Sequence, residues 1–362
     1  MTPPADQLTS IHVGGERPYD VLVGHGLADR VPSLVGDAAT VAVVSSQSLR
    51  HLSSPLLDVL SAAGRRVVEI ALPEGETAKS LQSMQILWDE LAEAGVDRHD
   101  AIVAVGGGAT TDAAGFAAST WLRGVRVVHV PTTLLGMVDA AIGGKTGINT
   151  AGGKNLVGAF HPPAGVLVDL ETLATLPADQ WVNGMAEVIK AGFIADPAIL
   201  DLIESDLEGA RRPDGRHTRE LVERSIVVKA NVVSDDLREA GLREILNYGH
   251  TLAHAVELVE EYRLPHGHAV SVGMVFVAAL SRFTRGLDPG VVARHRDILD
   301  AVGLPTTYEA EAWPRLIQAM RHDKKARAGR LRFVLLDDLA KPVVVDAPED
   351  DRLQQAFAEV AG

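Results

Sequence analysis

The sequence contains no cysteine among its 362 residues. Disulfide bridges, thiolate nucleophiles and cysteine-ligated zinc or iron–sulfur centres are therefore excluded, and any bound metal has to use His, Asp or Glu side chains. Positive charge is also in deficit, because 34 Lys and Arg residues stand against 48 Asp and Glu residues, a net charge of −14. This balance argues against non-specific binding to nucleic acid, whereas a local basic pocket for a small anion stays open.

Long apolar runs are absent as well. The longest such stretch, residues 269–280, is shorter than the ~20 residues that a membrane span requires and is interrupted by Ser271 and Gly273. Residues 1–7 have neither the basic nor the apolar region of a secretory signal. We therefore expect no membrane segment and a cytoplasmic location. With 46% hydrophobic residues, the chain is long enough and apolar enough for two domain cores.

The two halves of the chain differ in periodicity. In the first half, short β-branched runs alternate with helical patterns, which predicts a doubly wound α/β domain with a mostly parallel sheet. The second half is mainly α-helical, so we place a domain boundary at residue 183 and divide the chain into 1–183 and 184–362. The predicted strands of the first half are residues 10–13, 19–23, 40–44, 66–72, 101–105, 125–130 and 165–169. The predicted helices of the second half are residues 184–193, 218–235, 245–258, 268–285, 290–301 and 350–360.

A glycine-rich turn, residues 106–112, follows the apolar strand 101–105 and opens a helix. Glycines there let backbone N–H groups approach a diphosphate, and the helix N-terminus adds a partial positive charge. The spacing differs from the Rossmann fingerprint, and a tight strand-to-helix turn explains this segment equally well. Upstream, Glu76 and Lys79 could hold a ribose and a phosphate, although a helix-capping loop with solvated charges better explains that segment alone.

Residues 131–158 combine many glycines with few charges. Asp139, Lys145, Lys154 and Asn155 lie in this stretch. Because backbone donors and lysine side chains together suit an anion, we interpret the stretch as a binding loop rather than a solvated one.

Candidate metal ligands lie in the second half. His250 and His254 are four residues apart on a predicted helix and share a face, and Glu187, His266 and His268 lie in other segments. A set of three Glu and His ligands with an open position suits catalytic zinc. The zinc-protease arrangement is excluded, because no Glu follows His250. Spacing leaves open the alternative that these histidines cap helices or pack in the core.

Taken together and in this order, these segments resemble the 3-dehydroquinate synthases of the sugar phosphate cyclase family over about residues 72–336. The resemblance implies a Rossmann-like NAD-binding domain in 1–183 and a mainly helical metal- and substrate-binding domain in 184–362. It also implies a lyase that converts 3-deoxy-D-arabino-heptulosonate 7-phosphate to 3-dehydroquinate and phosphate, the second step of the shikimate pathway. Transient oxidation by NAD, phosphate elimination, reduction, ring opening and aldol closure make up the implied reaction.

The resemblance further implies roles for individual residues. Glu187, His250 and His266 would bind Zn²⁺ or Co²⁺, and His254 would contact the phosphate. Arg123 would reach the neighbouring site of a homodimer. The residues implied in substrate contact are Asp139, Lys145, Lys154, Asn155, Lys190, Lys229, Arg243, Asn247, His254 and one of Lys324 and Lys325. The residues implied in dinucleotide binding are Glu76, Lys79, Gly107, Gly108, Asp112, Thr132, Thr133, Lys145, Lys154, Thr172 and Thr175.

The sequence departs from the family pattern at several places. Thr111 stands where the family usually has Gly, His268 takes the place of a frequent Glu, and residues 45–47 lack an acidic residue for a ribose. One rival interpretation is a cyclase of carboxylate-free sugar phosphates, against which Arg243 counts because it suits a substrate carboxylate. Another is an iron-type alcohol dehydrogenase, in which the lysines would have no phosphate to bind. A non-enzymatic nucleotide-binding protein is the third, and the metal triad disfavours it.

Overall fold

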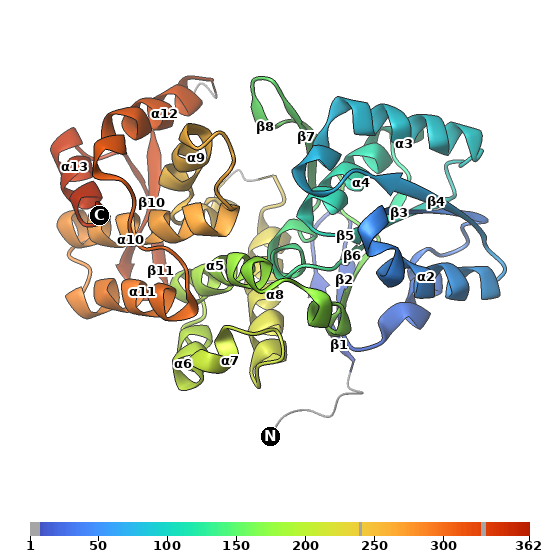
Figure 1. Cartoon of the computed structure of the whole chain (residues 1–362), viewed down its shortest axis with the longest axis horizontal. Coiled ribbons are helices and arrows are strands. Elements are labelled where there is room, and N and C mark those ends of the chain that lie inside the picture. The colour runs from blue at the N-terminus through green and yellow to red at the C-terminus, as the bar shows by residue number, and fades with distance from the viewer. Residues whose placement is uncertain (1–7, 239–240, 327–330) are drawn as a thin grey trace. The chain divides into compact units, whose positions relative to one another are not determined.

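The computed structural model describes residues 8–238, 241–326 and 331–362, with the backbone alone for 322–326. The chain divides into two compact units. Unit 1 comprises Met1–Leu176 and Lys229–Arg238, and unit 2 comprises Pro177–Val228 and Glu239–Gly362. The division at Lys229 therefore falls inside one helix, α8 (Thr218–Asp235), which Figure 1 labels.

Unit 1 is built on a seven-stranded sheet with the order β1-β2-β9-β6-β5-β3-β4. β1 and β2 form an antiparallel hairpin, and every other pairing in the sheet is parallel. All seven predicted strands are present, and the central ones, such as β3 and β5, are buried throughout and therefore read as apolar runs in the sequence. Their bounds are β1 (Thr9–Val13), β2 (Tyr19–Gly24), β3 (Thr40–Ser46), β4 (Arg66–Leu72), β5 (Ala101–Gly106), β6 (Arg126–Pro131) and β9 (Gly165–Asp169).

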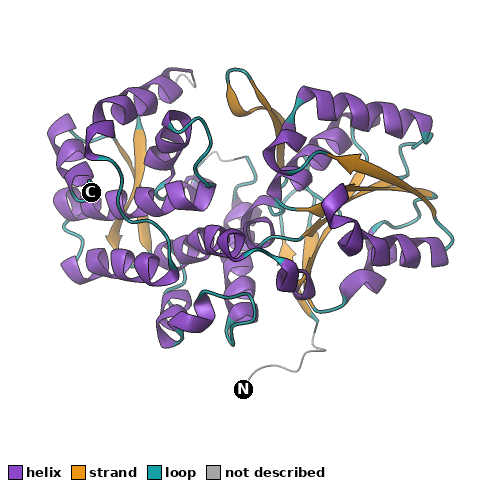
Figure 2. Ribbon diagram, in the orientation of Figure 1, coloured by secondary structure: helices purple, strands orange, loops and turns teal. Residues whose placement is uncertain are grey.

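Helices cover both faces of this sheet, as the strands lying between helices in Figure 2 show. Val41 and Val43 of β3 join the cluster under α1 (Val31–Leu34) and α2 (Arg50–Ala62). Ala42 and Val44 point to the opposite face and join the cluster under α3 (Leu81–Glu93) and α4 (Gly108–Thr120). The predicted doubly wound domain is confirmed. Strand order reverses between β3 and β5, and ligands of such sheets bind beyond the carboxyl ends of the strands at this point.

The glycine-rich stretch 131–158 is not the loop that the sequence suggested. It contains a π-helical turn, Gly136–Ala140, followed by the antiparallel hairpin β7 (Lys145–Thr150) and β8 (Gly153–Phe160), labelled in Figure 1. Gly147 and Gly158 face each other across the hairpin, and a Cβ at Gly158 would lie 2.3 Å from the Thr146 carbonyl oxygen. The glycines thus permit close strand pairing.

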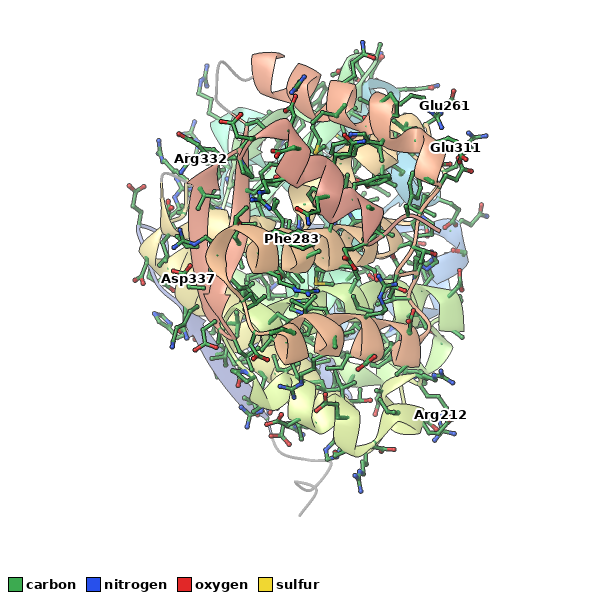
Figure 3. The ribbon with its side chains drawn as sticks, turned by 90° about the vertical axis from the view of Figure 1, so that its left-hand side faces the viewer. Arg212, Glu261, Phe283, Glu311, Arg332 and Asp337 are labelled. Atoms are coloured by element: carbon green, nitrogen blue, oxygen red, sulfur yellow. The ribbon has the colours of Figure 1, made fainter. Side chains whose placement is uncertain are left out.

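Unit 2 is mainly helical, as predicted, and is organised around α10 (His266–Arg285), which packs against α5, α9, α11, α13 and β10. Figure 3 shows this unit facing the viewer, with Phe283 of α10 and with Arg332 and Asp337 of β10 labelled. The other helices are α5 (Ala178–Ile194), α6 (Ala198–Ser205), α7 (Leu207–Ala210), α9 (His250–Val259), α11 (Pro289–Val302), α12 (Trp313–Ala326) and α13 (Asp350–Ala358). The strands β10 (Arg332–Asp338) and β11 (Lys341–Asp346) pair in an antiparallel hairpin.

α10 is the one helix in the described residues that is long and apolar enough to cross a membrane, and 78% of its most apolar window is buried. Such burial is typical of the core helix of a soluble protein. Two glycines let neighbouring backbones approach it closely. A Cβ at Gly273 would lie 2.0 Å from the Gly249 carbonyl oxygen, and a Cβ at Gly267 would lie 1.9 Å from the Asn183 carbonyl oxygen.

Candidate active site

Three potential metal ligands converge within unit 2. Glu187 lies in the buried part of α5, and His250 and His266 are the first residues of α9 and α10. Their ligand atoms all lie within 4.8 Å of one another. Glu187 Oε1 lies 3.5 Å from His250 Nε2 and 3.6 Å from His266 Nε2. His254, one turn further along α9, is not a member of this cluster in the described part of the chain.

Close backbone contacts fix the segments that carry these ligands. Gly249, directly before His250, adopts φ +80° and packs against Gly273. The N–H of Gly267, directly after His266, donates to the Asn183 side-chain oxygen at 2.6 Å. Asn183 lies one turn before Glu187 on α5, so the contact ties two ligand-bearing helices together. Side chains larger than hydrogen at these glycines would push the ligands apart.

The set fits a divalent metal. In a tetrahedral zinc site with bonds of about 2.0–2.1 Å, ligand atoms lie roughly 3.4 Å apart, close to the two carboxylate–imidazole separations given above. Glu187 is 3% exposed, and its Oε1 has no hydrogen-bond partner in the described residues. A buried carboxylate oxygen in this state is stabilised by a cation. Two nitrogens and one oxygen suit Zn²⁺ or Co²⁺ and leave a position for substrate or water.

Charge within the cluster is already compensated by the protein. Burial tends to raise the pKa of Glu187, but the Lys190 ammonium and the two imidazoles hold this pKa well below its usual range. Burial and the Lys190 charge lower the pKa of His250 to about 3, so its ring is neutral. Burial opposes the charge on His266, but the Glu187 and Glu257 carboxylates raise its pKa to about 10. The cluster therefore holds a carboxylate, a neutral imidazole and an imidazolium.

Each imidazole has an outer partner that orients it. His250 Nδ1 donates to the Tyr248 carbonyl oxygen at 3.1 Å, which leaves the Nε2 lone pair facing Glu187. His266 Nδ1 lies 3.4 Å from Glu257 Oε1. Metal-binding histidines usually donate their second N–H in this way. Sequence reasoning missed Glu257, although its place seven residues after His250 on the same face of α9 could have revealed it.

Several groups expected to contact substrate lie in the same unit. Lys190 pairs with Glu187, and the ring of His254 lies 5.5 Å from that of His250, edge to face. Arg243 is buried in the 3-10 turn Leu242–Asn247, which also holds Asn247 and packs against α5. The side chains of Lys324 and Lys325, at the end of α12, lie outside the described part of the chain.

In unit 1, the glycine-rich turn lies at the carboxyl end of β5, beside the point where strand order reverses. A Cβ at Gly107 would lie 3.1 Å from Thr133 Cγ2, and a Cβ at Gly108 would lie 2.9 Å from Ala140 Cβ. The Thr132 N–H donates to the Gly106 carbonyl oxygen at 2.9 Å. The turn thus brings the predicted residues Gly107, Gly108, Thr132 and Thr133 together. Thr111, which replaces the usual glycine of the family, is compatible with this turn, because its hydroxyl donates to the Gly108 carbonyl oxygen at 3.0 Å.

A polar network links this turn to the hairpin. Lys79 is buried, and its ammonium donates to Asp112 on α4 and to Asn155 on β8. The Asn149 amide donates to Glu76 at 2.7 Å. Burial raises the pKa of Asp112, although the Lys79 ammonium opposes this. Lys79 and Asp112, which were expected to bind the dinucleotide, therefore lie in one network with Asn155, which was expected to contact the substrate.

A second ion pair in unit 1 involves Asp139 and Lys229. Asp139 lies in the π-helical turn, and the Lys229 ammonium donates to both its main-chain and side-chain oxygens. Turns of this kind occur often at functional sites. Lys145 begins β7 with an exposed side chain, and Lys154 lies half-buried on β8.

The remaining expected residues lie in other surroundings. The hydroxyls of Thr172 and Thr175 donate to the carbonyl oxygens of Asp169 and Thr172 at 2.7 and 2.9 Å, so they stabilise their own 3-10 turn. Arg123 is exposed and adopts φ +70°, directly after Leu122 at φ +48°. Two successive non-glycine residues in the left-handed region mark this turn as strained.

Two family models match the chain in succession. The model described as 3-dehydroquinate synthase N-terminal matches residues 69–183, and that described as 3-dehydroquinate synthase C-terminal matches residues 184–326. The chain belongs to the 3-dehydroquinate synthase family. A 3-dehydroquinate synthase of Thermobifida fusca is 58% identical over 98% of this chain and 97% of its own length. One of Streptomyces coelicolor is 55% identical over 98% of this chain and 99% of its own.

Solved structures extend the comparison beyond 3-dehydroquinate synthases. 2-epi-5-epi-valiolone synthase from Streptomyces hygroscopicus subsp. jinggangensis, with NAD⁺ and Zn²⁺ bound, has a TM-score of 0.86 at 27% identity over 94% of this chain and 96% of that chain. 2-deoxy-scyllo-inosose synthase, complexed with carbaglucose-6-phosphate, NAD⁺ and Co²⁺, has a TM-score of 0.85 at 27% identity over 97% and 100%. An NADH-dependent butanol dehydrogenase from Thermotoga maritima, at 15% identity over 99% of each chain and a TM-score of 0.67, shares the fold alone.

Proposed function

We propose that this chain catalyses the 3-dehydroquinate synthase reaction, the conversion of 3-deoxy-D-arabino-heptulosonate 7-phosphate to 3-dehydroquinate and phosphate. The observation that carries the proposal is the triad of buried Glu187 and half-buried His250 and His266, with Lys190 beside it, in a chain 58% identical to a curated synthase over nearly its full length. Because the hydride returns to the substrate within each turnover, the enzyme is a lyase with no net oxidation. It acts in the shikimate pathway.

NAD and a divalent metal are the cofactors of the proposed reaction. When bound, the metal lowers the pKa of a substrate hydroxyl, and NAD⁺ accepts and returns a hydride. We assign Zn²⁺ or Co²⁺ to Glu187, His250 and His266, as the fit of this donor set supports. We assign NAD binding to residues 1–183 and binding of metal and substrate to residues 184–362. The residues assigned to NAD are Glu76, Lys79, Gly107, Gly108, Asp112, Thr132, Thr133, Lys145, Lys154, Thr172 and Thr175.

The chain's own residues supply charge and orientation. The Lys190 ammonium and the His254 ring lie beside the triad and suit the substrate phosphate. The buried guanidinium of Arg243 suits the carboxylate, to which it can donate two parallel hydrogen bonds. The departing phosphate, with a second pKa near ~6, can itself accept the proton of the neighbouring C–H, so no separate protein base is required. The other residues assigned to substrate are Asp139, Lys145, Lys154, Asn155, Lys229, Asn247, Lys324 and Lys325.

We include a cytoplasmic homodimer in the proposal, with Arg123 reaching the neighbouring site. The exposed, left-handed turn at Leu122 and Arg123 supports this role, because strained backbone persists where function requires it. A small sugar phosphate is the substrate partner, and both NAD and sugar phosphates are molecules of the cytoplasm.

Phosphate release tests the proposal most directly. Purified protein with NAD⁺ and Zn²⁺ or Co²⁺ is given the heptulosonate phosphate, sedoheptulose 7-phosphate or glucose 6-phosphate, while cofactor absorbance is followed. We expect release only with the heptulosonate phosphate, formation of 3-dehydroquinate and no lasting NADH. Release with a carboxylate-free sugar would refute the substrate assignment, and accumulating NADH would indicate a dehydrogenase.

The carboxylate assignment has its own test at Arg243. Arg243→Ala should reduce use of the heptulosonate phosphate strongly. Removing one partner of a buried charge pair costs on the order of 3–5 kcal/mol, because the other charge is left buried and unpaired. Arg243→Lys is the matched control, since it keeps the charge and loses the planar fork, and it should recover part of the activity. Equal KM values in wild type and Arg243→Ala would contradict the role.

A further inference from the structure

A hydrogen-bonded pair of buried side chains in unit 2, Tyr248 and His295, has no role in the site described above. Tyr248 and His295 are both 0% exposed. The Tyr248 hydroxyl lies 2.9 Å from His295 Nε2, and His295 Nδ1 lies 2.7 Å from the Val291 carbonyl oxygen. Because a carbonyl only accepts, Nδ1 carries the hydrogen and Nε2 accepts from the Tyr248 hydroxyl. Burial lowers the pKa of His295 to about 3, which agrees with a neutral ring.

The face of the same imidazole contacts the helix that carries Glu187. Phe193 of α5 stacks on His295 with ring centroids 3.4 Å apart and planes 12° from parallel. Phe193 lies three residues after Lys190 and six after Glu187. His295 of α11 therefore contacts both Phe193 of α5 and Tyr248, which lies just before α9.

Tyr248 connects this contact to a metal ligand. Its main-chain carbonyl oxygen accepts from His250 Nδ1 at 3.1 Å. Gly249, between the two residues, adopts φ +80° and packs against the backbone of Gly273 and Met274, so the peptide has little freedom. A fixed Tyr248 side chain thus fixes the direction of its carbonyl group and, through it, the ring of His250.

We propose that His295 and Tyr248 are positioning residues for His250, which hold its ring in the ligating tautomer and orientation before metal binds. The inference rests on the metal site proposed above. A phenol and an imidazole are not needed for packing alone, because apolar side chains of similar volume fill a core without any hydrogen bond to satisfy. Outer partners of metal-binding histidines typically change metal affinity 10–100-fold.

Titration of the metal-free protein with Co²⁺ tests the inference, with the dissociation constant and the visible ligand-field absorption as readouts. Tyr248→Phe removes one oxygen and keeps the carbonyl group that faces His250. We expect the Co²⁺ dissociation constant to rise about tenfold, the lower end of the range for outer partners, with a shifted absorption band. His295→Leu should have the same effect.

A double variant separates positioning from stability. Tyr248→Phe combined with His295→Leu removes both polar groups, so stability in urea should recover relative to the single variants while Co²⁺ binding stays weak. His129→Leu is the matched control, because His129 is also a buried imidazole with a pKa lowered to about 3 by burial but lies in unit 1. This variant should leave Co²⁺ affinity unchanged.

The outcomes distinguish this inference from the proposed function. Lower stability of Tyr248→Phe with wild-type Co²⁺ affinity and an unshifted band would overturn the positioning role. If the wild type bound no Co²⁺, or if Glu187→Gln bound it as tightly as the wild type, the metal site itself would be wrong.

Discussion

Replacing Gly273 with alanine should weaken metal binding without altering a ligand. A Cβ at this position would lie 2.0 Å from the Gly249 carbonyl oxygen and 2.8 Å from its carbonyl carbon. Contacts below 3.0 Å essentially never occur, and both atoms are backbone, so α9 and α10 have to separate by about 1 Å. Overpacking of this kind costs about 1–3 kcal/mol of unfolding free energy.

The same displacement acts on the residue after Gly249, which is His250. Metal ligands have to keep their distances within roughly 0.2 Å, so a shift of about 1 Å exceeds this tolerance several-fold. We therefore expect Gly273→Ala to raise the Co²⁺ dissociation constant at least about tenfold and to reduce turnover on the order of 100-fold. Urea unfolding of the metal-free protein, Co²⁺ titration and phosphate release measure the three effects.

Gly286→Ala is the matched control on the same helix. Gly286 ends α10 at φ +76° in open space, so alanine there costs only the roughly 1–2 kcal/mol of a left-handed residue. Its Co²⁺ affinity should equal that of the wild type. A folded Gly273→Ala protein with wild-type Co²⁺ affinity would refute the argument that this helix contact sets the position of His250.

Three further predictions concern the triad, the lysine network and acid stability. Glu187→Gln should abolish Co²⁺ binding and phosphate release, because a neutral amide replaces the one anionic ligand; metal content after dialysis checks this. Lys79→Met should raise the NAD⁺ dissociation constant at least about tenfold, because it leaves half-buried Asp112 without the buried ammonium that donates to it; fluorescence titration measures the change. Below pH 6.5 the unfolded chain protonates His129, whose pKa in the folded protein burial lowers to about 3. The free energy of unfolding should therefore fall between pH 6.5 and 5, by up to about 1.4 kcal/mol per pH unit for this residue, and less steeply in His129→Leu.

Each of these predictions has an outcome that contradicts it. Stoichiometric metal in Glu187→Gln would remove Glu187 from the ligand set. Unchanged NAD⁺ affinity in Lys79→Met, with Co²⁺ binding as an internal control, would remove Lys79 from the dinucleotide site. The same dependence of unfolding on pH in wild type and His129→Leu would show that His129 takes up protons in the folded protein.

The central strands could be predicted from local sequence alone. β3 and β5 are buried on both faces, so they read as continuous apolar runs bounded by polar and glycine residues. The metal site was only partly predictable in this way. The spacing of His250 and His254 showed a shared helix face, but it gave no means of choosing between His254 and His266. The packing of α9 against α10 favours His266, because it directs His266 Nε2 towards Glu187.

Contacts between distant residues account for what the sequence concealed. The β7–β8 hairpin looks like a loop in the sequence because it is rich in glycine, whereas in the structure these glycines permit close strand pairing. The hydrogen bond between Glu76 and Asn149 joins residues 73 positions apart. Tyr248 and His295 are 47 positions apart and look like ordinary core residues until their hydrogen bond is seen. Periodicity reports which face of an element is buried, but it does not report the partner that this face meets.

The compensated charge of the metal cluster bears on how the protein acquires its ion in a living cell. Lys190 gives the Glu187 carboxylate a cationic partner of the protein's own, so we expect the polypeptide to reach its final form before any ion is supplied. We then expect the helices to stay in place when the ion leaves and returns. Zinc scarcity would leave intact molecules in reserve, ready to be reloaded with whichever suitable cation the medium next provides.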